Sequence, residues 1–261
     1  MKIRINADDF GISPGVNAKI IEMYRSQKLD SASLIFGCGY ESEAIELAQL
    51  NLGLKVGLHL NLTTGKARSL SPEIMILVDK QRRFKYGFIS LLLLSVFSSK
   101  KLDRAVRVEL EAQLLTLKNA DITINHIDSH RHVHIIPRVF KIVNEVARKH
   151  NIKTIRVINE SFWYTWAINY KKNFLFNGGI VKFLVLKCLS LFNKPAVNSE
   201  YFFSILYSCT LSRELIEKIN IPGGYKKVEI MIHPGNPERD MELILEEQSH
   251  LISKNRNQES L

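Results

Sequence analysis

Short apolar and β-branched runs alternate with helical patterns along the chain, and this alternation restricts the fold more than any other feature. Strands are expected at residues 2–7, 32–36, 56–63, 121–124, 154–158 and 227–233. Helical spacing separates them at residues 14–24, 42–50, 102–117 and 137–147. Two later helices are expected, one capped by Thr210 or Ser212 and one at 238–252. Alternating strands and helices favour a parallel sheet, because parallel neighbours need a crossover connection.

Polar side chains lie at or near the ends of these strands. They are Asp8 and Asp9, His59, Asp128 and His130, Arg156, and His233. Five strands that supply polar groups at the same end fit a (β/α) barrel better than a doubly wound sheet, which collects them at one switch point. We therefore predict an α/β fold with mostly parallel strands and an active site at the strand C-terminal ends.

Residues 125–134 read Asn-His-Ile-Asp-Ser-His-Arg-His-Val-His and hold four of the eight histidines of the protein. If the strand continues, His126, Asp128 and His130 point to one side, because side chains alternate along a strand. A single histidine here would more often be structural. Four histidines with an aspartate favour a metal or catalytic role, since imidazole and carboxylate bind divalent metals. The cluster does not by itself name a reaction.

Two further strands supply candidate groups. Asp8 and Asp9 are adjacent, and such a pair is often only a turn former, but its position at the end of the first strand favours a function. His59 shares a face with Gly57 and Asn61, whereas the leucines of that strand alternate with them. This polar face makes His59 a candidate ligand.

The composition limits the partners and the compartment. Lys and Arg outnumber Asp and Glu by 36 to 26, and this net charge of +10 suggests affinity for anionic surfaces or substrates. No recognition motif for nucleic acid is present, so we expect no nucleic acid partner. Cys38, Cys188 and Cys209 form no Cys-x-x-Cys pair, and no signal peptide precedes the first strand, which favours a cytoplasmic location.

We expect one domain, residues 1–261, with inserts at about 65–100 and 161–209. The inserts contain apolar runs at 88–97, too short to span a bilayer, and at 180–192, which lysines interrupt. Three interpretations stay open for these runs: peripheral contact with the inner membrane face, packing against the barrel, and a homodimer contact. The long helix at 102–117 is a scaffold helix to which we assign no chemistry.

Four motifs occur in order along the chain. They are Asn6-Ala7-Asp8-Asp9-Phe10-Gly11, Gly57-Leu58-His59-Leu60-Asn61-Leu62-Thr63, the stretch from His126 to His134, and Ile232-His233-Pro234-Gly235. Together they resemble the YdjC-like carbohydrate deacetylases, the family of chitooligosaccharide deacetylase and the hopanoid-biosynthesis-associated deacetylase. The resemblance extends to about residue 240 and implies an irregular (β/α) barrel that removes N-acetyl groups from sugars with a divalent metal, Mg²⁺ or Zn²⁺. The two inserts match nothing in it.

The resemblance also implies roles for particular residues. Asp9, His59 and His130 would bind the metal, Asp8 would be the general base, and His233 the general acid. The family often has a histidine where this chain has Arg131, a departure that leaves the metal set intact. His134 or Arg156 could hold sugar hydroxyls, although a structural salt bridge explains either residue equally well.

The chemistry of these residue types agrees with amide hydrolysis. Water bound to a metal is a strong nucleophile at neutral pH, and three protein ligands leave coordination positions open for it. The implied substrate is an N-acetylated sugar, free or lipid-linked. Two alternatives are a metal-dependent phosphoesterase on the same barrel, which the basic charge favours but for which no glycine-rich phosphate cradle is found, and a non-catalytic carbohydrate-binding or scaffold protein.

Overall fold

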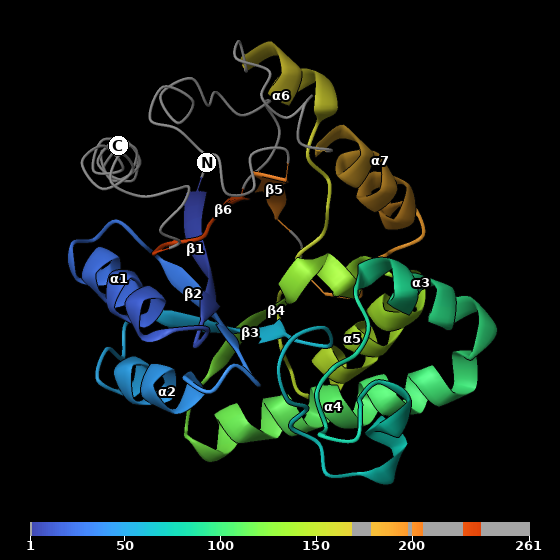
Figure 1. The fold of residues 1–261 in the computed structure, drawn as a ribbon. Coiled ribbons are helices and arrows are strands. Elements are labelled where there is room, and N and C mark those ends of the chain that lie inside the picture. Colours follow the sequence, from blue (N-terminus) through green and yellow to red (C-terminus); the bar gives the residue numbers. More distant parts are fainter. Residues whose placement is uncertain (1, 169–178, 198–199, 206–226, 236–261) are drawn as a thin grey trace.

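The computed structural model describes residues 2–168, 179–197, 200–205 and 227–235 (Figure 1). Its elements are β1 (Lys2–Phe10), α1 (Pro14–Arg25), β2 (Ser31–Ile35), α2 (Glu41–Gln49), β3 (Lys55–Leu60), η1 (Pro72–Ile76), α3 (Phe88–Phe97), α4 (Ser99–Asn119), β4 (Ile124–Ser129), η2 (His130–Ile135), α5 (Pro137–Lys149), α6 (Phe162–Ile168), α7 (Gly179–Ser190), β5 (Tyr201–Phe203) and β6 (Lys227–Ile232). The helices expected after residue 210 and at 238–252, and Cys209, lie outside the described residues.

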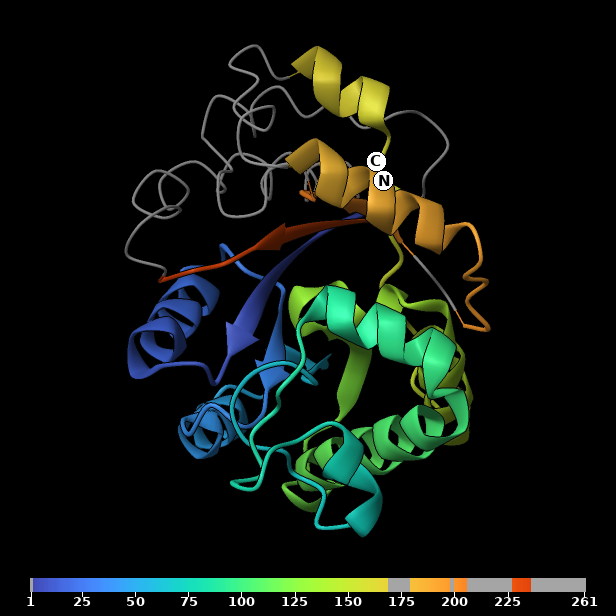
Figure 2. The same ribbon diagram turned by 45° about the vertical axis from the view of Figure 1, so that its right-hand side comes forward.

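The described strands form one sheet in the order β4-β3-β2-β1-β6-β5, and every neighbouring pair is parallel. The sheet curls into a half-barrel with helices around it (Figures 1 and 2). The predicted α/β class and parallel arrangement are therefore confirmed, and the curl is consistent with an irregular barrel. In place of the expected strand at 154–158, the structure has isolated bridge residues at Thr154 and Ile155, and Ile155 pairs in parallel with Ile127.

Local hydrogen bonds move two predicted strand boundaries. The strand expected at 56–63 ends at Leu60, because Asn61 Oδ1 accepts hydrogen bonds from the backbone N–H groups of Thr63 and Thr64 and turns the chain. The strand expected at 121–124 begins only at Ile124. The residues before it close the C-terminus of α4, where Ile122 N donates to Leu117 O.

The helices begin where the sequence places their caps. Ser13 Oγ accepts from Val16 N at the start of α1, with Pro14 as the first helical residue. Pro137 likewise opens α5, whose apolar face is buried at Val139, Phe140, Ile142, Val143, Val146 and Ala147. These faces cover the outside of the sheet and hold the strand ends in place.

Both inserts contain regular structure. The first holds η1, two antiparallel bridges and α3, and the second holds α6, α7 and β5. Figures 1 and 2 show α3 and α7 on the same side of the molecule, one above the other. Among the described residues, no helix combines the length and the apolar character that crossing a membrane requires.

Candidate metal and catalytic site

The inner face of the sheet is polar, and its side chains come from alternate residues of each strand. On β1, Arg4, Asn6 and Asp8 share this face. Asn6 Nδ2 donates to Asp8 Oδ1 over 2.9 Å and to Ser33 Oγ over 2.8 Å, and Arg4 Nη1 donates to Ser31 Oγ over 2.9 Å. All five side chains are buried. This polar network therefore fixes the position of the Asp8 carboxylate through Asn6.

A β-bulge brings two adjacent aspartates to one site. The register of β1 against β2 shifts between Ala7 and Phe10, and Asp9 has a φ of 67°. In a regular strand Asp8 and Asp9 would point to opposite faces, whereas a bulge re-aims one of them. Both carboxylates consequently approach His59, with Asp9 Oδ1 3.4 Å from Nε2 and Asp8 Oδ2 4.0 Å from Nδ1.

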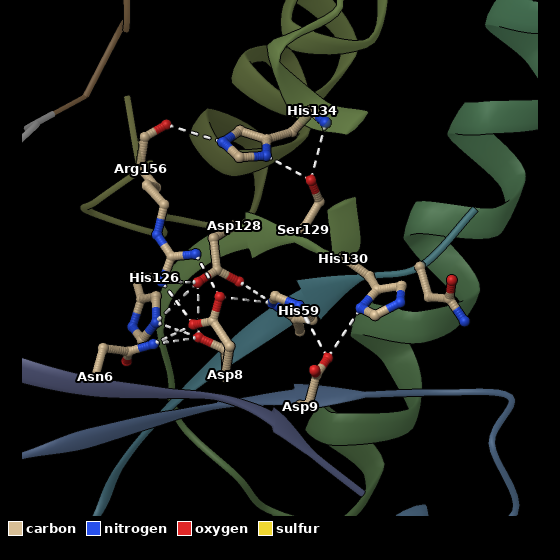
Figure 3. A network of polar contacts seen from close by, with 12 residues as sticks. Asn6, Asp8, Asp9, His59, His126, Asp128, Ser129, His130, His134 and Arg156 are labelled. Atoms are coloured by element: carbon tan, nitrogen blue, oxygen red, sulfur yellow. Dashed lines mark hydrogen bonds and ion pairs between the residues drawn. The ribbon is translucent and has the colours of Figure 1, made fainter. Parts of the chain in front are cut away.

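His59 is oriented by a carboxylate on the neighbouring strand. His59 on β3 is paired in register with Asp128 on β4, and its Nδ1 lies 2.7 Å from Asp128 Oδ1. This bond directs Nε2 toward Asp9 (Figure 3). Burial lowers the pKa of His59, but Asp128 and Asp8 outweigh it and raise the pKa to about 10. A carboxylate behind a histidine is the usual partner of a metal-binding imidazole.

His130 reaches the site from the turn that follows β4. It begins η2, in which Arg131 and His132 both have left-handed backbone, with φ of 55° and 56°. The Nδ1 of His130 lies 2.9 Å from Asp9 Oδ1, and its ring meets that of His59 edge-on. Burial alone would raise the pKa of Asp9, but the hydrogen bonds from His130 and His59 hold it well below its usual range.

Asp9, His59 and His130 fit a divalent cation. One candidate ligand atom from each lies within 4.8 Å of the others. Metal–ligand bonds of about 2 Å place the ligands of a tetrahedral ion roughly 3.3 Å apart, close to the separations found here. A second group, Asp8, His59 and Asp128, also lies within this limit. It fits less well, since Arg156 is paired with both of its carboxylates.

Arg156 anchors the acidic side of the site. Its guanidinium donates to both oxygens of Asp8, over 2.7 and 2.8 Å, and pairs with Asp128 over 2.6 Å and Glu229 over 2.5 Å. Burial would lower its pKa, but these three carboxylates raise it well above the usual range. Burial would likewise raise the pKa of Asp128, which Arg156 and His59 hold well below the usual range. The pairing keeps three buried carboxylates compensated.

His233 follows β6, and its Nδ1 is buried without a hydrogen-bond partner among the described residues. Burial is the main reason that its pKa is lowered, while Asp8 and Asp9 act in the opposite direction. The imidazole therefore lies within electrostatic reach of both aspartates. An unsatisfied buried nitrogen at such a place is available to a bound molecule.

His134 and Arg156 are bonded within the protein. His134 Nε2 donates to the Arg156 backbone oxygen, which leaves Nδ1 to accept from Ser129 Oγ. Both side chains are buried, with residue exposures of 0% and 2%. These contacts favour the structural alternative that the sequence left open over a direct contact with sugar hydroxyls.

His126 packs on a glycine that leaves room for its ring. A Cβ on Gly57 would lie 2.3 Å from the imidazole atoms of His126. His126 Nε2 lies 3.0 Å from Ser33 Oγ, which in turn donates to Asp128 Oδ2 over 2.7 Å. His126 and Asp128 thus point to one side, as the alternation predicts, and both support His59.

The structure brings together Asp8, Asp9, His59 and His130, with His233 nearby. Asp128 was predicted as part of the histidine cluster but without an individual role, and Glu229 and Ser33 were not predicted to belong to the site. A signal for Asp128 was present, because it lies between two histidines at alternate positions of one strand. Glu229 and Ser33 carried no such signal, since each lies singly in an apolar strand.

Comparison with known proteins agrees with this arrangement. Residues 2–260 match the family model described as YdjC-like protein. A carbohydrate deacetylase of Clostridium beijerinckii is 32% identical, over 90% of this chain and 82% of the relative, and one of Vibrio parahaemolyticus is 25% identical, over 92% and 81%.

A crystal structure from Enterococcus faecalis, described as that of a cellobiose-phosphate cleavage protein, superimposes with a TM-score of 0.66. It is 24% identical and covers 95% of this chain and 85% of its own, which shows a shared fold. Because nearly the whole chain, residues 2–260, matches the family model, the chain belongs to the YdjC-like family.

Proposed function

We propose that this protein is a metal-dependent hydrolase that removes N-acetyl groups from an amino-sugar-containing carbohydrate. The observation that carries the proposal is the convergence of Asp9, His59 and His130 beside Asp8 and His233. Two relatives that align over more than four fifths of their length are named carbohydrate deacetylases, which supports the same reaction. The family match over residues 2–260 supports a single deacetylase domain.

Asp9, His59 and His130 would hold the divalent ion, with Zn²⁺ favoured over Mg²⁺ because two of the three ligands are nitrogen. When bound there, such an ion supplies Lewis acidity toward the acetyl carbonyl and lowers the pKa of water. Asp128 keeps the Nδ1 proton of His59 and so presents Nε2 to the ion. Binding of an ion there would require Nε2 of His59 to be deprotonated.

Asp8 would accept the proton of the attacking water. Its carboxylate is 1% exposed and is held by Asn6 and by both terminal nitrogens of Arg156. A fixed carboxylate loses no orientation before proton transfer, which is the advantage of a positioned base. In this proposal Arg156 is a positioning residue. It holds the carboxylate of Asp8, which takes a proton from water and must later release it.

His233 would protonate the leaving amine. Its buried Nδ1 has no partner among the described residues, and it directly follows β6, the strand that pairs with β1. A lowered pKa makes the imidazolium a stronger acid, but it also reduces the fraction of protonated His233 at neutral pH. A general acid works best where these two effects balance, with a pKa near the working pH.

The test is an assay of two products from one preparation. Purified protein, stripped with a chelator and reloaded with Zn²⁺ or Mg²⁺, is incubated with N-acetylated oligosaccharides and, separately, with phosphate monoesters. We expect acetate and free amine from the sugars, only in the metal-loaded protein. Phosphate release without acetate would replace the deacetylase with the phosphoesterase alternative.

A further inference from the structure

The inference concerns a pocket between the two inserts and rests on the proposed function. A cavity of about 310 Å³ lies between α3 and α7, a size within the range of ligand sites. Its apolar walls are Phe88, Ile89, Val181, Val185 and Leu186. The remaining lining residues are Arg131 and Lys182, so the pocket combines apolar walls with two cations.

The surface around this pocket is unusually apolar. On α3, Ile89 and Leu93 are 61% and 54% exposed, and on α7 Val181 and Leu184 are 66% and 52% exposed. Both helices lie on the same side of the molecule (Figure 2). Contiguous apolar surface that is left open by a folded chain usually marks a binding surface. The apolar parts of a free N-acetylated sugar, its C–H face and acetyl methyl group, are small compared with a hydrocarbon chain.

The pocket adjoins η2, the element that also supplies His130 to the candidate catalytic site. Both α3 and α7 pack against η2, the element that begins with His130. Arg131, which lines the pocket, follows His130 directly. Burial is the main cause that lowers the pKa of His233, and the positive charges of His59 and Lys182 lower it further. Lys182 therefore lies within electrostatic reach of the site. A ligand seated between α3 and α7 would therefore approach the site past two cations.

We infer that this pocket receives the hydrocarbon chain of the substrate, an N-acetylated sugar joined to a lipid through a phosphate ester. The chain would lie between α3 and α7, and Arg131 and Lys182 would face the phosphate. Charge complementarity favours an anionic linkage over a neutral glycolipid, because both polar side chains that line this pocket are cationic. The sugar would then extend along η2 toward His130.

The test measures binding of decyl phosphate, below its critical micelle concentration, by calorimetry on the purified full chain. Burying a methylene favours binding by roughly fourfold, so decyl phosphate should bind far more tightly than butyl phosphate. Decyl glucoside, which lacks the anion, should bind more weakly than decyl phosphate. The double variant Ile89→Glu/Val181→Glu, which places carboxylates on exposed wall positions, should lose at least tenfold in affinity.

A charge-matched control is available at two exposed leucines that do not line the pocket. Leu52 and Leu70 are 91% and 84% exposed, and Leu52→Glu/Leu70→Glu should bind decyl phosphate like the wild type. Equal weakening in both double variants, or no binding by the wild type, would overturn the inference. Binding only to anionic vesicles would also overturn it, in favour of docking on a bilayer. Dissociation of a dimer by Ile89→Glu/Val181→Glu, without decyl phosphate binding, would do so in favour of a subunit contact.

This binding measurement is separate from the test of the proposed function. Deacetylation of free diacetylchitobiose by the wild type and by Leu52→Glu/Leu70→Glu reports the proposed function alone, because this substrate has no hydrocarbon chain to place between α3 and α7. Binding of decyl phosphate without deacetylation of any sugar would refute the proposed function and support the ligand chemistry of the pocket. Deacetylation without decyl phosphate binding would refute the pocket alone.

Discussion

At the scale of single residues, the site depends on how each histidine nitrogen is assigned. The Nδ1 of His59 contacts Asp128, and its Nε2 points toward Asp9. Asp128 therefore fixes the tautomer, and Asp9 is a second candidate ligand beside Nε2. Asp128 is also compensated by Arg156 and Ser33. Arg156 keeps Asp8 and Glu229 as partners when the charge of Asp128 is removed, so we expect the loss to affect metal binding more than the fold.

Asp128→Asn should weaken Zn²⁺ binding by roughly 10–100-fold, the usual effect of losing a carboxylate that orients a metal-binding histidine. Competition with a chromophoric chelator measures the affinity. Glu111→Gln is the matched control, because Glu111 pairs with His150 over 2.7 Å at a partly exposed site on α4. Unchanged affinity in Asp128→Asn, or an equal loss in the control, would contradict the role of Asp128.

The proposed base and acid make a second prediction at this scale. Asp8→Asn keeps the shape of the side chain but removes the proton acceptor, so it should retain the metal and lose most turnover. His233→Ala should lose roughly 10²–10⁴-fold in kcat if the imidazole protonates the leaving amine. Metal content by mass spectrometry and acetate release are measured together, with His150→Ala as control. Near-normal turnover at unchanged metal content would remove the residue from the mechanism.

At the scale of elements, the sequence predicts most of what periodicity encodes. Buried parallel strands and amphipathic helices have apolar patterns, so β1, β2, β3 and β6 and helices α1, α2, α4 and α5 were predicted within a few residues at their ends. The strand predicted at 121–124 overlaps β4 only at Ile124. β5 was missed because it has three residues, Tyr201–Phe203, in a region without a repeating pattern. Its pairing depends on β6, far along the chain.

The details of the site were harder to predict than the strands. Alternation alone places Asp8 and Asp9 on opposite faces, and only the bulge in β1 brings both to one site. Glu109 is a similar case. It lies on a helix to which no chemistry was assigned, yet it is fully buried and accepts from the backbone N–H groups of Arg68 and Ser69. Both arrangements depend on contacts between distant segments, which local patterns do not encode.

The contact between β3 and β4 gives a prediction at this scale. Because a Cβ at residue 57 would lie 2.3 Å from the His126 ring, Gly57→Ala must displace that ring or separate the strands. We expect a loss of roughly 1–3 kcal/mol in the free energy of unfolding, as for other overpacked cores, and weaker Zn²⁺ binding through His59. Urea unfolding and chelator competition measure both. Gly15→Ala is the control, since no atom lies within 4 Å of a Cβ there.

At the scale of the whole molecule, the interior of the half-barrel is polar, and its stability depends on protonation. The pKa of His134 is lowered to about 4, mainly by burial, so the folded protein keeps this imidazole neutral well into the acid range. An unfolded chain binds the proton near pH 6.5. Between these values the unfolded state holds more protons, so the contribution of His134 to stability falls as the pH falls through this window.

We therefore expect His134 to make the fold acid-sensitive. Between pH 7.5 and pH 5 its share of the loss in the free energy of unfolding is about 2 kcal/mol. His134→Gln removes the titrating group but keeps a side chain that can hydrogen-bond, so it should be less stable than the wild type at pH 7.5 and should lose less on acidification. Urea unfolding of both proteins at the two pH values gives this double difference, in which other titrating groups cancel. If both proteins lose the same free energy, the acid sensitivity of the fold resides elsewhere than in His134.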